Sequence, residues 1–302
     1  MGPVLLLSNW YSGATLFSFL LDSHPELVCN GETFPLIEGD KRRNVCSCGA
    51  YIDTCDFYRK TTKIIKGYEF PKSWDYENAV VKPILHRNRF INKFLMSPCR
   101  DGILRNTLIK HMSAKEKINK YIDYNFKFMQ SALRYNSSSI YIDGTKSIRR
   151  AQIFARYADV KVFKIIFLIR DGRAFCNSYR KNRNVSESNL IRAAKEWNQY
   201  IHLVDELHKR NENIKMINVR YEDLCNNKNE VFDKMKEFLN LDPLSEFETD
   251  KLPSHILGNR MRKNFNFDIQ EDNSWESELS SQTVSKIEVI MLRNLLRYNY
   301  IN

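Results

Sequence analysis

The sequence predicts an α/β fold in which a parallel sheet is flanked by helices on both faces. Short continuous apolar runs, such as those at 4–7 and 162–169, are typical of strands that are buried on both faces. These runs alternate along the chain with segments whose apolar residues recur every three or four positions, which indicates helices. A chain of 302 residues can bury a substantial core as one domain.

The elements can be placed in chain order from these patterns. The first strand and helix occupy about 3–22, with a loop of small residues at 9–13 between them, and residues 29–75 show no regular pattern. A mainly helical insertion is expected around 76–135. Further strands are expected at 140–142, 162–169 and 214–219, and further helices at 147–157, 188–210, 231–239 and 284–298. We therefore expect a single domain over 1–302.

The loop between the first strand and the first helix is the most informative stretch. A strand, a small-residue loop and a helix point backbone N–H groups and the positive end of the helix at one spot, which suits phosphate or sulfate. Ser12-Gly13-Ala14-Thr15 lacks the Lys that a Walker A loop places before its hydroxyl residue, so an ordinary P-loop nucleotidase is not expected. Taken alone, the segment is equally consistent with a plain βα turn.

Further blocks extend this interpretation along the chain. They are Tyr11–Thr15 with Ser23-His24-Pro25, IDGTKSIRRA at 142–151, KIIFLIRDGRAFCNSYRK at 164–181, VRYEDL at 219–224 and HILGNRMR at 255–262. Together and in this order, they resemble the sulfotransferases that use 3′-phosphoadenosine 5′-phosphosulfate (PAPS), in particular the bacterial carbohydrate and small-molecule type. The resemblance implies a P-loop-like sulfotransferase fold. It also implies transfer of a sulfuryl group from PAPS to a hydroxyl or amine of a small-molecule or carbohydrate acceptor, with 3′-phosphoadenosine 5′-phosphate (PAP) as product.

The resemblance also assigns residues to the two ends of the nucleotide. The 5′-phosphosulfate is expected at Tyr11, Ser12, Gly13, Ala14, Thr15 and Leu16. Arg170 and Ser178, which have the family's eight-residue spacing, are expected to hold the 3′-phosphate, and Tyr221 is expected near the adenine. The ordinary alternatives are that Arg170 pairs with Asp171 or Glu222, and that Tyr221 packs in the core.

The catalytic groups are less clearly marked. Tyr11 stands where many members have Arg or Lys, so another cation is expected to compensate: Lys146 as first choice and Arg262 as second. Glu32 is the candidate base that deprotonates the acceptor, since it follows His24-Pro25 at the position of a catalytic acid in some relatives. The alternatives are that Glu32 pairs with the basic residues 41–43, or that His24 or His255 is the base.

Composition limits the other classes of function. The net charge of +11 invites a nucleic-acid interpretation, but the basic residues are scattered and no nucleic-acid-binding motif accompanies them. No apolar run is long enough to span a bilayer and no signal peptide is evident, so we expect a cytoplasmic protein with neither a nucleic-acid nor a membrane partner. The rival functions are a noncatalytic nucleotide-binding protein of the same fold, a kinase-like phosphotransferase and a nucleic-acid binder.

Seven cysteines, an odd number, argue against a disulfide framework. Three of them form CSCGAYIDTC at 46–55. A zinc site usually has CxxC pairs and four ligands, whereas this segment has CxC and three. We therefore expect a reduced structural loop and no metal, with zinc binding by Cys46, Cys48 and Cys55 left open.

Overall fold

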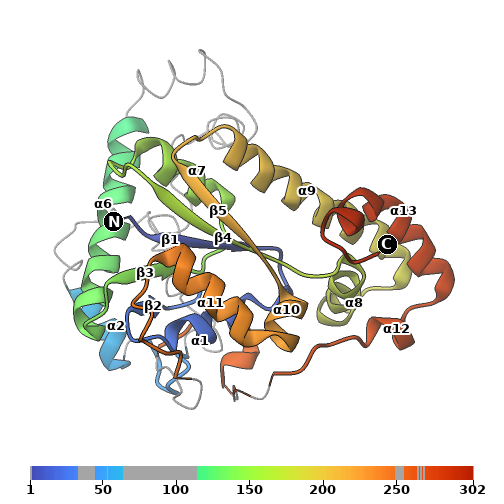
Figure 1. The fold of residues 1–302 in the computed structure, drawn as a ribbon, viewed down its shortest axis with the longest axis horizontal. Coiled ribbons are helices and arrows are strands. Elements are labelled where there is room, and N and C mark those ends of the chain that lie inside the picture. Colours follow the sequence, from blue (N-terminus) through green and yellow to red (C-terminus); the bar gives the residue numbers. More distant parts are fainter. Residues whose placement is uncertain are drawn as a thin grey trace.

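A parallel sheet forms the centre of the molecule (Figure 1). The computed structural model describes residues 2–32, 45–52, 54–63, 114–248, 255–263, 265, 267 and 269–301. In that part of the chain the strands are β1 (Val4–Ser8), β2 (Leu27–Cys29), β3 (Ile140–Asp143), β4 (Phe163–Ile169) and β5 (Ile214–Arg220). They lie in the order β2-β3-β1-β4-β5, and every pairing is parallel. The predicted fold class is confirmed.

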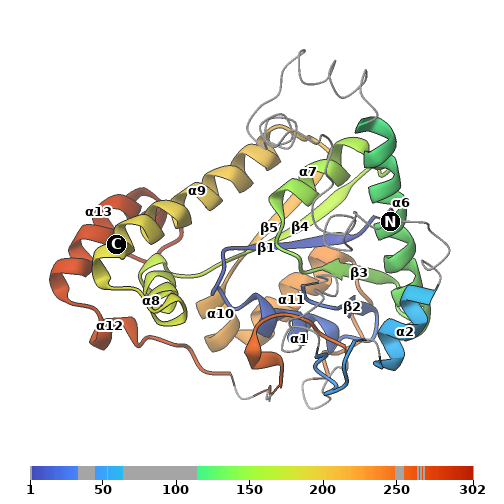
Figure 2. The ribbon, with the colours of Figure 1, turned by 180° about the vertical axis from the view of Figure 1, so that it is seen from behind.

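Helices cover both faces of this sheet (Figures 1 and 2). Those of one core cluster are α2 (Asp56–Lys63), α6 (Ala114–Asn136), α7 (Ile148–Tyr157), α8 (Gly172–Arg183), α9 (Leu190–Lys209) and α13 (Ser281–Arg297). Those of the other cluster are α1 (Ala14–Asp22), α10 (Tyr221–Asn226) and α11 (Lys228–Leu239). The short elements are η1 (Glu187–Asn189), η2 (Arg260–Lys263) and α12 (Trp275–Glu278).

The apolar runs of the strands follow from this two-sided packing. Leu5 and Leu7 of β1 belong to the cluster of α6 to α9, whereas Val4 and Leu6 belong to the cluster of α1 and α11. Successive side chains of a strand point to opposite faces, so a strand covered on both sides has to be apolar throughout. All five residues of β1 are buried.

The order of the strands determines where a site can form. The connection from β1 leads to β2, on the β3 side, whereas the connection from the neighbouring strand β4 leads to β5, on the other side, so the two crossovers leave β1 and β4 in opposite directions. In open parallel sheets ligands bind at such a switch point, beyond the carboxyl ends of the strands. The segments that follow all five strands lie at this edge: 9–13, 30–32, 144–146, 170–171 and 221.

Within the described residues, each predicted strand and helix has a counterpart near its expected position. The strand β2 and the helices α2, α8, α10 and α12 were not among the elements placed from these patterns; β2, with three residues, is too short for a periodic pattern. Helix α6 accounts for the end of the expected insertion at 76–135, and residues 76–113 lie outside the described residues. No helix of the described chain is both long enough and apolar enough to cross a bilayer.

Candidate active site

The loop after β1 adopts a conformation that only a glycine can complete. Gly13 caps α1 at φ 82°, and Tyr11 is also left-handed, at φ 59°. A Cβ on Gly13 would lie 2.4 Å from Cδ2 of Tyr221, so the tyrosine ring closes directly over the loop. Among the described residues no side chain caps α1, and its first turn has no acidic residue. The start of α1 therefore keeps the positive potential that favours an anion.

Arg170, just beyond β4, joins this loop to α8. Its guanidinium Nη1 donates to the carbonyl of Tyr11 at 3.0 Å and to the hydroxyl of Ser178 at 3.1 Å. The guanidinium also stacks on the Tyr221 ring, 4.7 Å from its centroid. Arg170 is 5% exposed, and its Nε has no hydrogen-bond partner among the described residues. Residues far apart in sequence thus converge on one buried cation.

Asp272 also contacts this cation, a partner that the sequence did not reveal. Arg170 Nη2 donates to the main-chain carbonyl of Asp272 at 2.9 Å and to its carboxylate at 3.1 Å. Although partial burial raises the pKa of Asp272, hydrogen bonds from Ser274 and Arg170 lower it overall. The ordinary partners considered for Arg170 were Asp171 and Glu222. Instead, Glu222 accepts the backbone N–H of Asp171 at 2.9 Å.

Glu32 and Lys146 form an ion pair across the ends of β2 and β3. The Lys146 side chain is 11% exposed and that of Glu32 21%, so both are partly reachable from solvent. Lys146 has a left-handed backbone, at φ 59°, and its carbonyl accepts the Tyr200 hydroxyl at 3.0 Å. The two residues predicted as catalytic are therefore in contact with each other. Glu32 thus has a cationic partner outside 41–43, which are not among the described residues.

The segment 255–262 lies against both the loop and Glu32. The Glu32 N–H donates to the Leu257 carbonyl at 2.9 Å. The Asn259 N–H approaches the Thr15 hydroxyl at 3.4 Å, and a Cβ on Gly258 would lie 2.7 Å from that hydroxyl oxygen. The HILGNRMR block therefore contributes backbone to the site, which its resemblance alone did not reveal.

Arg262, the second choice for the compensating cation, is bound to main-chain carbonyls in this structure. Its guanidinium donates to the carbonyls of Val45 at 2.9 Å, Gly258 at 2.5 Å and Asn259 at 2.8 Å. Burial lowers the pKa of Arg262, as expected for a cation removed from water. The Arg262 side chain thus joins Val45 to the segment 258–259.

Neither histidine is placed as an acceptor base. His24 is 1% exposed, packs on Phe247 and lies beyond the far end of α1, and burial lowers its pKa. His255 turns its Nδ1 toward the sulfurs of Cys46 and Cys55, and burial lowers its pKa to about 4. Of the three candidates for the acceptor base, Glu32 is the one that lies beside Lys146 at the carboxyl edge of the sheet.

No protein-family profile matches the chain, and no curated protein matches it. Among solved structures, the sulfotransferase domain from the curacin biosynthetic pathway is 16% identical, with 97% of this chain and 96% of that one covered at a TM-score of 0.47.

Two further solved structures are similar over most of this chain. The sulfotransferase domain of the Synechococcus PCC 7002 olefin synthase is 15% identical, with 95% and 94% of the two chains covered at a TM-score of 0.48. Sulfotransferase STF9 from Mycobacterium avium is 14% identical, with 97% of this chain and 76% of that one covered at a TM-score of 0.48. These structural neighbours are all sulfotransferases or sulfotransferase domains, at low sequence identity.

Proposed function

We propose that this protein is a PAPS-dependent sulfotransferase acting on a hydroxyl or amine of a small-molecule or carbohydrate acceptor. The observation that carries the proposal is the position of Arg170, whose guanidinium contacts both the Tyr11 carbonyl and the Ser178 hydroxyl. The loop and the Arg–Ser pair are the two segments expected to bind opposite ends of the nucleotide. Their contact makes a single site for one nucleotide geometrically possible.

The residues present fit a nucleotide that carries phosphate at both ends. The uncapped start of α1 and the Thr15 hydroxyl offer donors for a 5′-phosphosulfate. The Arg170 fork and Ser178 offer donors for a 3′-phosphate, and the buried Arg170 Nε, unpartnered within the described chain, is a further donor. PAPS supplies the sulfuryl group and a phosphate leaving group when bound.

The chemistry left to the protein is positioning, charge stabilisation and removal of the acceptor proton. We assign proton removal to the Glu32 carboxylate and charge stabilisation to the Lys146 ammonium. Their ion pair holds the two side chains together, at the same edge of the sheet as the loop. Glu32 takes the proton only when the acceptor hydroxyl or amine lies within hydrogen-bond reach of it.

Replacement of Arg170 by Ala tests the nucleotide site directly. A buried charged hydrogen-bond donor contributes about 2–3 kcal/mol, so the Kd for PAP is expected to rise roughly 30- to 150-fold in titration calorimetry. Arg180→Ala is the matched control, because Arg180 lies on α8, as Ser178 does, but pairs with Glu278. An unchanged Kd for Arg170→Ala would contradict the assignment, as would a preference of the unmodified protein for ATP over PAP and PAPS.

Asp272→Asn has the opposite expected effect. A 3′-phosphate and the Asp272 carboxylate compete for the same guanidinium, so removal of the charge is expected to tighten PAP binding. Because the Asp272 side chain is 46% exposed, solvent screening limits the gain to roughly two- to five-fold in Kd. Asn keeps the oxygen that accepts the Ser274 N–H. Weaker PAP binding by this variant would show that Asp272 does not compete with the nucleotide.

A noncatalytic nucleotide-binding protein is the second candidate function. The observations that favour it are the Asp272 carboxylate on Arg170 and the uncharged Tyr11 in the loop. Sulfate transfer to a broad panel of acceptors can be monitored by mass spectrometry. Tight PAP binding without any such transfer would select this candidate. A transferred sulfate on any acceptor would exclude it.

The acceptor is the least constrained part of the proposal. The segment 29–135 carries aromatic residues of the kind that suits a flat or sugar-like acceptor, among them Tyr58, Phe70, Trp74, Tyr76 and Phe90. Of these, Tyr58 is buried and donates to the His255 carbonyl at 2.9 Å, which is a structural role. The others, Phe70, Trp74, Tyr76 and Phe90, lie outside the described residues. Trp10, 55% exposed within the loop after β1, supports a flat or sugar-like acceptor.

A further inference from the structure

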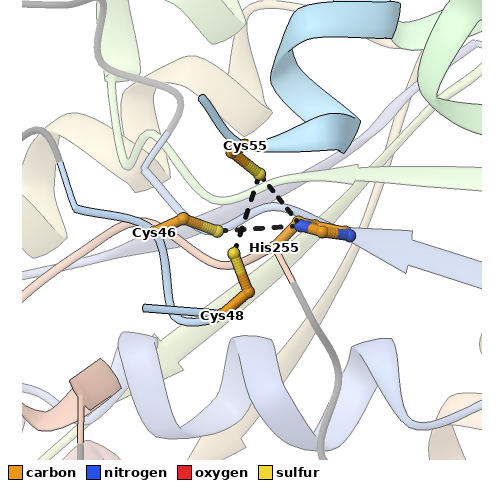
Figure 3. Close-up of side chains that lie close together, drawn as sticks. All are labelled: Cys46, Cys48, Cys55 and His255. Atoms are coloured by element: carbon orange, nitrogen blue, oxygen red, sulfur yellow. Dashed lines mark hydrogen bonds between the residues drawn. The ribbon is translucent and has the colours of Figure 1, made fainter. Parts of the chain in front are cut away.

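We infer that Cys46, Cys48, Cys55 and His255 bind a structural zinc ion. Their ligand atoms, three sulfurs and one imidazole nitrogen, all lie within 4.8 Å of one another. Figure 3 shows the four side chains pointing toward a common centre. The sequence alone showed only three ligands because the fourth is 200 residues away from Cys55.

Three of the six separations between the ligand atoms lie near those of a tetrahedral zinc site. The Cys48 and Cys55 sulfurs are 3.7 Å apart, and His255 Nδ1 lies 3.7 Å from the Cys46 sulfur and 3.3 Å from the Cys55 sulfur. With Zn–S bonds of about 2.3 Å and Zn–N bonds of about 2.0 Å, tetrahedral ligand atoms lie about 3.5–3.8 Å apart. Because every ligand atom lies within 4.8 Å of the others, shifts of about 1 Å would bring the whole set to tetrahedral spacing.

The donor set distinguishes zinc from other uses of these residues. A disulfide needs its sulfurs about 2.05 Å apart and would leave two of the four donors without a purpose. Three soft thiolates exclude calcium and magnesium, and iron–sulfur clusters are generally held by four cysteines. Four protein ligands and no open position are typical of a structural zinc site.

The local fold orients each ligand. Cys46 and Cys48 lie on a tight turn in which the Gly49 N–H donates to the Cys46 carbonyl at 3.0 Å, with Gly49 at φ 86°. Cys55 directly precedes α2. The His255 ring stacks on Phe57, with centroids 4.7 Å apart and planes 12° apart. The ligands are thus held by the protein itself.

The ion would fasten the 45–55 loop to the segment 255–262. Two hydrogen bonds already join the two segments: the Ser47 N–H donates to the Ile256 carbonyl at 3.1 Å, and the Ile256 N–H donates to the Ser47 hydroxyl at 2.8 Å. The next residue, Leu257, accepts the Glu32 N–H. Zinc would therefore also fix the support of Glu32; this last consequence rests on the proposed function, whereas the zinc site does not.

Metal analysis of the untagged full chain, purified without chelator, tests the site. We expect one zinc per chain by inductively coupled plasma mass spectrometry. Cys48→Ser is expected to lower zinc affinity by more than roughly tenfold in a chelator-dye competition, since even loss of a supporting residue costs that much. Cys48 is exposed, so its replacement removes a ligand with little change in packing. Cys225→Ser is the control and should retain the ion.

Cobalt substitution of the unmodified protein gives a second readout that needs no variant. Tetrahedral coordination by thiolates predicts a charge-transfer band and strong visible absorption, and chelation is expected to lower the Tm. Absence of both zinc and a cobalt spectrum, or a Cys48–Cys55 disulfide in peptide mapping of freshly prepared protein, would overturn the site. PAP calorimetry on the same sample separates the proposals, because zinc without PAP binding would contradict only the sulfotransferase.

Discussion

Replacement of Glu32 by Gln is expected to lower turnover by roughly 10²- to 10⁴-fold, the usual contribution of a positioned general base. Gln is nearly the same size and keeps an oxygen near Lys146, but it cannot take a proton from the acceptor. The measurement is the rate of PAP formation from PAPS with the acceptor that the screen identifies. The Kd for PAP should stay the same, because Glu32 is not assigned to the nucleotide.

Lys146 supplies the control for this result. If Glu32 and Lys146 act as a unit, the Glu32→Gln/Lys146→Met double variant should be scarcely slower than the worse single variant, whereas independent groups would show multiplied losses. Glu206→Gln, which breaks an ion pair on α9, should keep full activity. A Glu32→Gln enzyme within threefold of the unmodified rate would reject the carboxylate as base.

Arg150→Met is expected to destabilise the fold by about 3–5 kcal/mol, because it leaves a buried carboxylate without its partner. Arg150 is 1% exposed and donates to the Asp143 carboxylate; it also donates to the hydroxyl of Tyr121 at 3.2 Å and to Asn125 Oδ1 at 2.6 Å. Urea unfolding monitored by circular dichroism measures the loss.

The neighbouring arginine makes a matched comparison. Arg149 is only partly buried, so Arg149→Met should change stability by less than about 0.5 kcal/mol. The Asp143→Asn/Arg150→Met double variant should recover part of the loss, since no unpaired charge remains buried. Equal stability of Arg150→Met and the unmodified protein would show that the pair contributes nothing. Asp143 also accepts the Thr145 N–H and hydroxyl, so the pair supports the turn that carries Lys146.

The fold was predictable because its signals are local. Local sequence patterns mark these elements: the apolar runs of β1 and β4, and the apolar stripe on α9. A short run that is apolar on both faces is typical of a strand buried on both sides. β2 was missed because three residues carry no period. The Arg170–Ser178 contact was anticipated from a spacing within one strand–helix unit, and the two groups do meet, at 3.1 Å.

The rest of the site depends on contacts between distant segments. Arg170 lies 102 residues from Asp272, and Lys146 lies 114 residues from Glu32. Nothing in the flanking sequence of either residue signals its partner, because ion pairs require only that the fold bring opposite charges together. The fourth ligand of the cysteine cluster was hidden for the same reason, even though His255 had been singled out for another role.

The position of β1 in the middle of the sheet has a consequence for biosynthesis. Its neighbour β3 is synthesised roughly 140 residues later. At the usual rate of protein synthesis, the apolar strand β1 therefore has no pairing partner for on the order of 7–28 s. During that interval its unpaired edges invite aggregation, and a holdase that shields the nascent N-terminal region would raise the yield of native protein.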